Sequence, residues 1–239
     1  MNRTLVTVTQ IALIVALPLV FILGTIRAVL ATDTFLRFEY YRPGFSPDGL
    51  GFVPQEPLWG PDERMRLGGA TLVWLRDGRP LSELAALRKP DNATPLYTLN
   101  ELGHMDDVQR LTNLISRVLL VLGPLVVLLM LVLGLRRGTR RDLAAALTGA
   151  GVFTWVTAGL LAVLLLGGVG SSSWDTLFVG FHQAFFPQGN WQFLYSDSLI
   201  RLFPEQLWYD CAIVLLGAPL LLAAVSAIVG LAWRRSVAR

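Results

Sequence analysis

Two histidines, His104 and His182, are the only side chains of this 239-residue chain whose ordinary pKa lies close to neutrality. Any acid/base chemistry at neutral pH is therefore expected to use one or both. His104 stands in the segment Glu-Leu-Gly-His-Met-Asp-Asp that begins at Glu101. On a helix, Asp107 shares a face with His104 and orients or charge-stabilises the imidazole, an arrangement that suits a general base. The alternative is a helix start at the membrane interface, where acidic residues favourably meet the helix dipole.

His182 stands in a second unusual segment, Phe-His-Gln-Ala-Phe-Phe-Pro-Gln-Gly-Asn-Trp, which begins at Phe181. Its aromatic residues are expected to form an apolar pocket around the imidazole, with the amides of Gln183, Gln188 and Asn190 as hydrogen-bond donors. A histidine that is simply packed at the membrane interface is the alternative. Because both histidines flank apolar stretches at a similar expected membrane depth, the sequence predicts that they meet at one site.

Other reactive groups point to less. Asp197, Arg201 and Glu205 recur at helical spacing, where a surface ion pair competes with a role of Arg201 in binding a lipid phosphate. The motifs of serine hydrolases, zinc proteases, phosphate-binding loops and thiol redox proteins are missing. We expect no metal and no cofactor, because 78 positions separate the two histidines. The single cysteine, Cys211, excludes an internal disulfide and is interpreted as a packing residue.

The composition places these residues in a membrane protein. Hydrophobic residues make up 54% of the chain and charged residues only 15%, too apolar a balance for a water-soluble domain. A bilayer core needs about 20 apolar residues per helix. Four segments meet this need, which predicts an α-helical integral membrane protein with four transmembrane helices at residues 1–30, 114–135, 143–170 and 207–233.

Basic residues predict the orientation of these helices. Four arginines fall within positions 136–141, in the short loop 136–142, and more basic residues occupy the tail 234–239. Cytoplasmic loops carry such an excess, so both termini are expected in the cytoplasm. The same placement explains the net charge of +3 without nucleic acid as a partner. The first helix is interpreted as a retained anchor, because its apolar run is longer than that of a cleaved signal peptide.

The two remaining segments are then expected outside the cytoplasm. Residues 31–113 carry nine basic and twelve acidic residues and are predicted to form a small mixed α/β cap domain. Ala70–Leu75 is interpreted as a strand, Asp77-Gly78 as a hairpin turn, and Leu81–Arg88 as a short helix capped by Ser82. Residues 171–206 are rich in Trp, Tyr and Phe, which predicts an aromatic interfacial loop, partly a helix along the membrane surface.

The segments around both histidines, together with Ser-Leu-Ile-Arg-Leu-Phe-Pro-Glu-Gln at 198–206, resemble a bacterial family of four-span membrane proteins that includes the lipoprotein intramolecular transacylase. The resemblance extends over nearly the whole chain. It implies an acyltransferase at the outer leaflet of the cytoplasmic membrane, with diacylglyceryl lipoproteins and membrane lipids as partners. In that family an acyl chain moves from the sn-2 glyceryl position to the α-amino group of the N-terminal cysteine, which gives the lyso form.

The resemblance also implies that the functional histidines of the family correspond to His104 and His182. An α-ammonium group must lose a proton before it attacks an ester, and a neutral imidazole is a suitable acceptor. We assign His104 as the base and His182 as the oxyanion stabiliser or acid, in roles that are exchangeable. The candidate orienting, oxyanion-stabilising or substrate-binding side chains are Asp106, Asp107, Gln183, Asn190, Trp191, Asp197 and Arg201.

Two functions of other classes compete with this interpretation. One is a non-enzymatic envelope protein that binds a lipid or a partner, in which both histidines are dispensable and an aromatic residue such as Trp191 is not. The other is a small transporter, which is disfavoured because the interiors of the predicted helices lack the charged residues that such pathways use.

Overall fold

The computed structural model describes residues 2–43, 59–168 and 174–236, and within these ranges the chain is mostly helical. The chain divides into two compact units. Unit 1 consists of residues 1–27, 115–172 and 213–239, and unit 2 of residues 28–114 and 173–212.

Unit 1 contains the apolar parts of four long helices: α1 (Arg3–Ala31), α5 (Leu99–Gly134), α6 (Arg140–Gly168) and α9 (Glu205–Ser236). These four helices are the ones in the described chain that are long and apolar enough to cross a membrane. Many of their large apolar side chains face outward, among them Leu120, Leu160 and Leu216. The four long apolar helices predicted from the sequence are therefore present as candidate membrane spans.

Small residues bring α6 and α9 together within unit 1. A Cβ atom added at Gly151 on α6 would lie 2.3 Å from the carbonyl oxygen of Ala223 on α9, and one added at Gly230 on α9 would lie 2.6 Å from that of Ala144. Ser226 adds a hydrogen bond from its hydroxyl to the Leu147 carbonyl across the same contact, at 3.0 Å. Close backbone approach of this kind is how helices associate where lipid removes the hydrophobic driving force.

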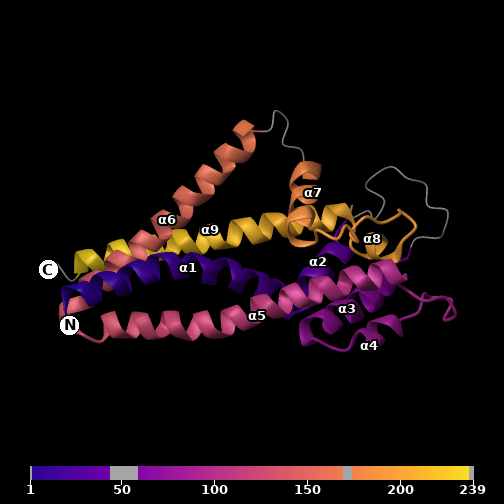
Figure 1. Cartoon of the computed structure of the whole chain (residues 1–239), viewed down its shortest axis with the longest axis horizontal. Helices are drawn as coiled ribbons and strands as arrows, with labels where there is room; N and C mark the ends of the chain where they lie inside the picture. Colours follow the sequence, from indigo (N-terminus) through magenta and orange to yellow (C-terminus); the bar gives the residue numbers. More distant parts are fainter. Residues whose placement is uncertain (1, 44–58, 169–173, 237–239) are drawn as a thin grey trace. The chain divides into compact units, whose positions relative to one another are not determined.

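One end of unit 1 is strongly basic. Figure 1 shows the start of α1, the end of α9 and the connection between α5 and α6 at the same end of this unit. That connection contains the short helix η1 (Arg137–Thr139), and the side-chain amide of Gln10 on α1 donates to the Asp142 carbonyl at 3.0 Å. The arginines of these segments are Arg3 at the start of α1, Arg136, Arg137, Arg140 and Arg141 from the α5–α6 connection to the first turn of α6, and Arg234 and Arg235 in the last turn of α9.

Unit 2 is built from the polar first turns of α5 and from shorter helices: α2 (Thr34–Tyr41), α3 (Pro61–Asp77), α4 (Leu81–Ala85), α7 (Trp174–Phe185) and α8 (Ser198–Leu202). One core of unit 2 joins α3, α4, α8 and the start of α5 around Leu67, Trp74, Leu84, Leu102 and Leu202. Buried hydrogen bonds close the packing, since the Tyr40 hydroxyl donates to the Leu202 carbonyl at 2.6 Å. Unit 2 thus combines the start of α5 with the segment that precedes it in the sequence, residues 28–98, and with residues 173–212, which follow much later.

The prediction of a mixed α/β cap is wrong. Ala70–Leu75 lies inside helix α3, and the described residues contain one isolated bridge, between Arg88 and Pro95, in place of a sheet. The buried side chains of α3 include Arg64, Leu67, Thr71 and Trp74, a spacing of three to four residues that belongs to a helix. The short run Ala-Thr-Leu-Val-Trp-Leu was too brief to distinguish the helical period from strand alternation.

Two local predictions inside this region are also wrong. Asp77-Gly78 ends α3 rather than turning a hairpin: Gly78 has φ +65°, and the Arg79 amide bonds back to the Trp74 carbonyl at 3.2 Å. Glycine in this left-handed conformation is the usual residue after a helix. The short helix α4 is present, but its N-cap is Pro80, not Ser82. Part of the predicted cap, residues 44–58, lies outside the described residues.

Candidate functional site

The start of α5 positions His104. The Thr98 amide donates to Glu101 Oε2 at 2.6 Å, and the Glu101 amide donates to Thr98 Oγ1 at 3.3 Å, which is a capping box. The second oxygen of Glu101 accepts the Leu199 amide at the start of α8, also at 2.6 Å. One fully buried carboxylate therefore holds the starts of two helices, and His104 follows it by one turn. Burial raises the pKa of Glu101, and these hydrogen bonds act in the opposite direction.

Helix α7 positions His182, and its backbone sets the tautomer of the ring. His182 Nδ1 lies 2.8 Å from the Phe178 carbonyl oxygen, one turn earlier. A carbonyl oxygen only accepts, so Nδ1 carries the proton. In the neutral ring, Nε2 is then the unprotonated nitrogen, available to accept a proton from a substrate.

The structure brings the two histidines together. Their ring centroids are 5.9 Å apart, with the planes inclined by 29°. Aromatic rings surround both: Phe186 lies 4.8 Å and Phe193 5.5 Å from His104, whereas Phe178 lies 4.1 Å and Trp191 5.0 Å from His182. His104 is 6% exposed, and His182 is half-buried. The result is an imidazole pair in an apolar enclosure.

This enclosure keeps both imidazoles neutral at pH 7. Loss of solvation lowers the pKa of His104 to about 4, and the neighbouring His182 contributes in the same direction. The Asn190 side chain and the charge of Asp107 act against this change. Burial likewise lowers the pKa of His182, opposed by its bond to the Phe178 carbonyl. Both residues lie outside the apolar part of the long helices, and His104 precedes Arg110 on α5.

The acidic residues near His104 have other direct partners. Asp107 Oδ2 accepts the amide nitrogens of Gln188, at 2.5 Å, and Asn190, at 2.7 Å. Asp106 accepts the Arg110 guanidinium at 2.5 Å. Asn190 is thus committed through its nitrogen to Asp107, whereas the sequence suggested it as an oxyanion donor.

The remaining predicted residues lie at different distances from the pair. Trp191 contacts His182, and the Gln183 side chain is exposed on α7. Asp197 precedes α8 and accepts the Leu194 amide at 2.8 Å, and Arg201 is buried with its guanidinium 4.7 Å from the Trp59 ring centroid. Helix α8 ends at Leu202, so Glu205 does not continue the face of Asp197 and Arg201.

Sequence reasoning missed three residues that build the site. Phe186 was expected only in the pocket around His182 and Phe193 only in the aromatic loop, yet the rings of both enclose His104. Glu101 was seen as an acid near a helix start. The pattern Thr98-x-x-Glu101 is a recognisable capping box and could have identified it.

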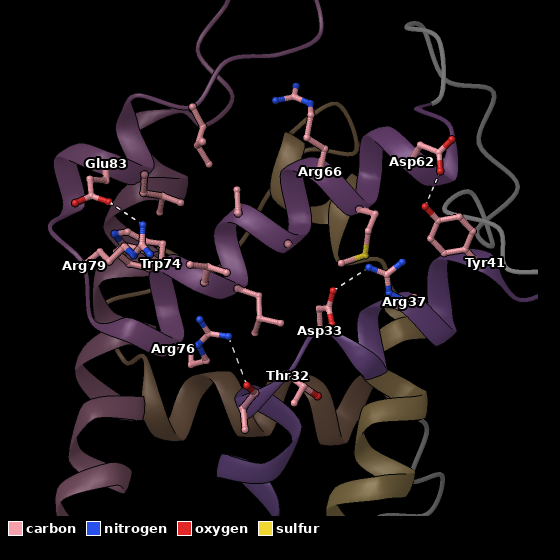
Figure 2. A pocket seen from close by; sticks show the side chains of 18 residues that line it. Thr32, Asp33, Arg37, Tyr41, Asp62, Arg66, Trp74, Arg76, Arg79 and Glu83 are labelled. Atoms are coloured by element: carbon pink, nitrogen blue, oxygen red, sulfur yellow. Dashed lines mark hydrogen bonds and ion pairs between the residues drawn. The ribbon is translucent and has the colours of Figure 1, made fainter.

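A hollow of about 920 Å³ lies elsewhere in unit 2, between the end of α1 and helices α2, α3 and α4 (Figure 2). Neither histidine lines it. Four of its charged residues form two ion pairs, Arg37 with Asp33 at 3.1 Å and Arg79 with Glu83 at 3.5 Å. Among the residues that the structure describes, no group of three metal-ligating side chains is found. The histidine pair is therefore the better candidate for chemistry.

Comparison with known proteins shows the family to which this chain belongs. A family model described as lipoprotein intramolecular transacylase Lit matches residues 86–208, slightly more than half of the chain. An uncharacterised protein of Aquifex aeolicus (strain VF5) is 27% identical over 188 residues, which cover 79% of this chain and 77% of that protein. The membrane-integral lipoprotein intramolecular transacylase Lit from Bacillus cereus has a similar fold, with a TM-score of 0.72 at 17% identity, covering 99% of this chain and 97% of that chain. The matched segment contains both histidines.

Proposed function

The chain belongs to the lipoprotein intramolecular transacylase family, and we propose that it moves an acyl chain from the sn-2 glyceryl position of a diacylglyceryl lipoprotein to the α-amino group of the same N-terminal cysteine. The observation that carries the proposal is the pair of neutral, aromatic-enclosed imidazoles 5.9 Å apart. Because ester and amine belong to one molecule, the substrate itself supplies proximity. The protein must fold the substrate, move protons and stabilise the oxyanion.

The count of protons explains why two imidazoles are useful. The α-ammonium group loses two protons in becoming an amide nitrogen, and the departing glyceryl oxygen gains one, so one proton leaves for solvent. We assign the first proton to His182, whose Nε2 is unprotonated and whose half-buried position gives it a route to water. His104 takes the second proton from the nitrogen of the tetrahedral adduct and passes it to the glyceryl alkoxide.

The environment of His104 suits this second transfer. Burial that lowers its pKa to about 4 makes the imidazolium a strong acid, which readily protonates an alkoxide. The same apolar enclosure also lowers the pKa of a substrate amine that enters it, because burial disfavours the charged form of both groups. More of the attacking amine is then neutral at pH 7.

An apolar surface next to the pair suits a lipid substrate. Leu177, Phe181 and Phe185 recur every four residues along one face of α7 and are 42%, 49% and 52% exposed. The ring centroid of Phe181 lies 5.4 Å from that of His182. We propose that this stripe contacts acyl chains of the substrate or of the surrounding membrane.

The arginines at one end of unit 1 support the proposed orientation. Basic residues accumulate on the cytoplasmic side of membrane proteins, so we propose that both termini and the α5–α6 connection lie in the cytoplasm. His104 lies near the opposite, N-terminal end of α5. We therefore place the reaction at the outer leaflet of the cytoplasmic membrane.

The test uses a host that lacks the final N-acylation enzyme, with lipoprotein acyl forms read by mass spectrometry. His104→Ala and His182→Ala are each expected to abolish the lyso form while the protein remains in the membrane at normal abundance. Gln192→Ala, an exposed neighbour of the site, is the matched control and is expected to retain activity. Lyso product at the control level from either histidine variant would remove that histidine from the mechanism, and from both variants would favour a lipid- or partner-binding protein.

A further inference from the structure

The side chain of Asp107 fixes the orientation of the Asn190 amide. Its Oδ2 atom accepts two amide nitrogens, from Gln188 and from Asn190. An ionised carboxylate only accepts hydrogen bonds, so the nitrogen of Asn190, rather than its oxygen, must face Asp107. This contact resolves the two possible orientations of the amide and leaves Asn190 Oδ1 on the other side.

Two buried atoms near this contact have complementary hydrogen-bonding capacity. Asn190 Oδ1 and His104 Nδ1 are both buried, and the described residues give neither of them a conventional hydrogen bond. The amide of Asn190 lies at the turn of α5 that carries His104. Its nitrogen is 3.9 Å from the position of a Cβ atom at Gly103, the residue before His104, and the Asn190 side chain opposes the lowering of the pKa of His104. The carboxamide oxygen can only accept, whereas Nδ1 donates if it carries the ring proton.

We propose that Asn190 is a positioning residue that holds the proton of His104 on Nδ1, and that Asp107 acts through Asn190 by fixing its amide. His104 then presents an unprotonated Nε2, as His182 does through the Phe178 carbonyl. The site therefore offers two acceptor nitrogens of the same kind, one held by a backbone oxygen and one by a side-chain amide. The catalytic use of this arrangement rests on the proposed function, but the tautomer itself does not.

The alternative orientation of Asn190 shows why Asp107 matters. A turned amide would set its oxygen against the Asp107 carboxylate, where two acceptors repel, and its nitrogen against His104 Nδ1. The ring proton would then move to Nε2, and His104 could no longer accept a proton there. A carboxylate at position 107 excludes this arrangement, whereas an amide at position 107 permits it.

The first experiment reads the tautomer directly. The natural chain has two histidines, so the full-length protein labelled with ¹⁵N-histidine, and purified without a histidine tag, gives two sets of ring signals in detergent micelles at pH 7. A His182→Gln variant assigns them. We expect His104 to carry its proton on Nδ1 in the natural protein and to shift toward Nε2 in Asp107→Asn. Gln188→Ala removes the other amide from Asp107 and is the matched control, in which the His104 tautomer stays unchanged.

The double variant Asp107→Asn, Asn190→Asp separates positioning from simple structural support. Its carboxylate lies at position 190 and faces His104, so Nδ1–H is restored and the pKa of His104 rises above that of the natural protein. We expect transacylation to fall at least tenfold in kcat in Asp107→Asn with little change in KM, and to recover partly in the double variant.

The outcomes are distinct. A natural protein with the His104 proton on Nε2, or an Asp107→Asn variant with an unchanged tautomer, would overturn the proposal. Because the spectra are recorded without substrate, the expected tautomers together with a loss of the proposed transacylation would refute the function and leave the role of Asn190 intact.

Discussion

The aromatic residues that enclose His104 are expected to control the pKa of its imidazole. A pKa of about 4, against an ordinary 6.5, corresponds to about 3 kcal/mol in favour of the neutral ring. Burial is the main cause, and the rings of Phe186 and Phe193 pack against the imidazole. The variant Phe193→Ser opens one side of the enclosure to water and is expected to raise the pKa of His104 by at least one unit, with the remaining rings keeping it below 6.5.

Nuclear magnetic resonance of the ¹⁵N-labelled histidines, recorded from pH 3.5 to 8, measures this pKa. The acid limb of kcat/KM should move with it, since that limb reports the free enzyme. At pH 5 the Phe193→Ser variant is then expected to lose more activity than at pH 7.5. Between pH 6.5 and about 4, His104 is protonated in the unfolded chain but stays neutral in the folded protein. The free energy of unfolding of the natural protein therefore falls as the pH is lowered through this range.

The control is Phe181→Ser, whose ring contacts His182 and is 49% exposed. It should leave the pKa of His104 in place. A natural protein in which His104 titrates near 6.5, or equal pKa values in the natural protein and Phe193→Ser, would refute the explanation by burial.

Three further predictions concern other parts of the chain. Glu101→Gln puts an amide nitrogen against a backbone donor and should cost about 1–3 kcal/mol of stability, measured as a lower unfolding temperature in detergent. Glu101→Ala should cost more. Equal stability of both variants and the natural protein would contradict the role of Glu101 at the starts of two helices. Gly151→Ala forces α6 away from α9 and should cost about 1–3 kcal/mol, whereas Gly159→Ala, on the same helix with open space around it, should be neutral; equal losses would argue against the close helix contact. Gly138→Cys should react with a membrane-impermeant thiol reagent only from the cytoplasmic side, and Ala93→Cys only from the outside. Cys211 is buried and is expected not to react. The reverse labelling pattern would contradict the proposed topology.

Local properties of the sequence were enough for the long helices. A membrane-spanning helix satisfies its own backbone hydrogen bonds, so length and apolarity predict it without knowledge of its neighbours. The same reasoning failed for Ala70–Leu75, because a run of six residues carries too little periodicity to distinguish a strand from part of a buried helix. Burial in α3 depends on partners from α2, α5 and α8, which are distant in the sequence.

The sequence by itself determined which residue types were available: four apolar helices, two histidines, and aromatic residues around the second histidine. Only the tertiary structure decided that the two imidazoles stand 5.9 Å apart, that Asp107 binds Asn190, and that Glu101 reaches Leu199. These contacts join residues about 80 to 100 positions apart. The sequence by itself did not determine them because they depend on how the helices pack against one another, which no local pattern of residues encodes.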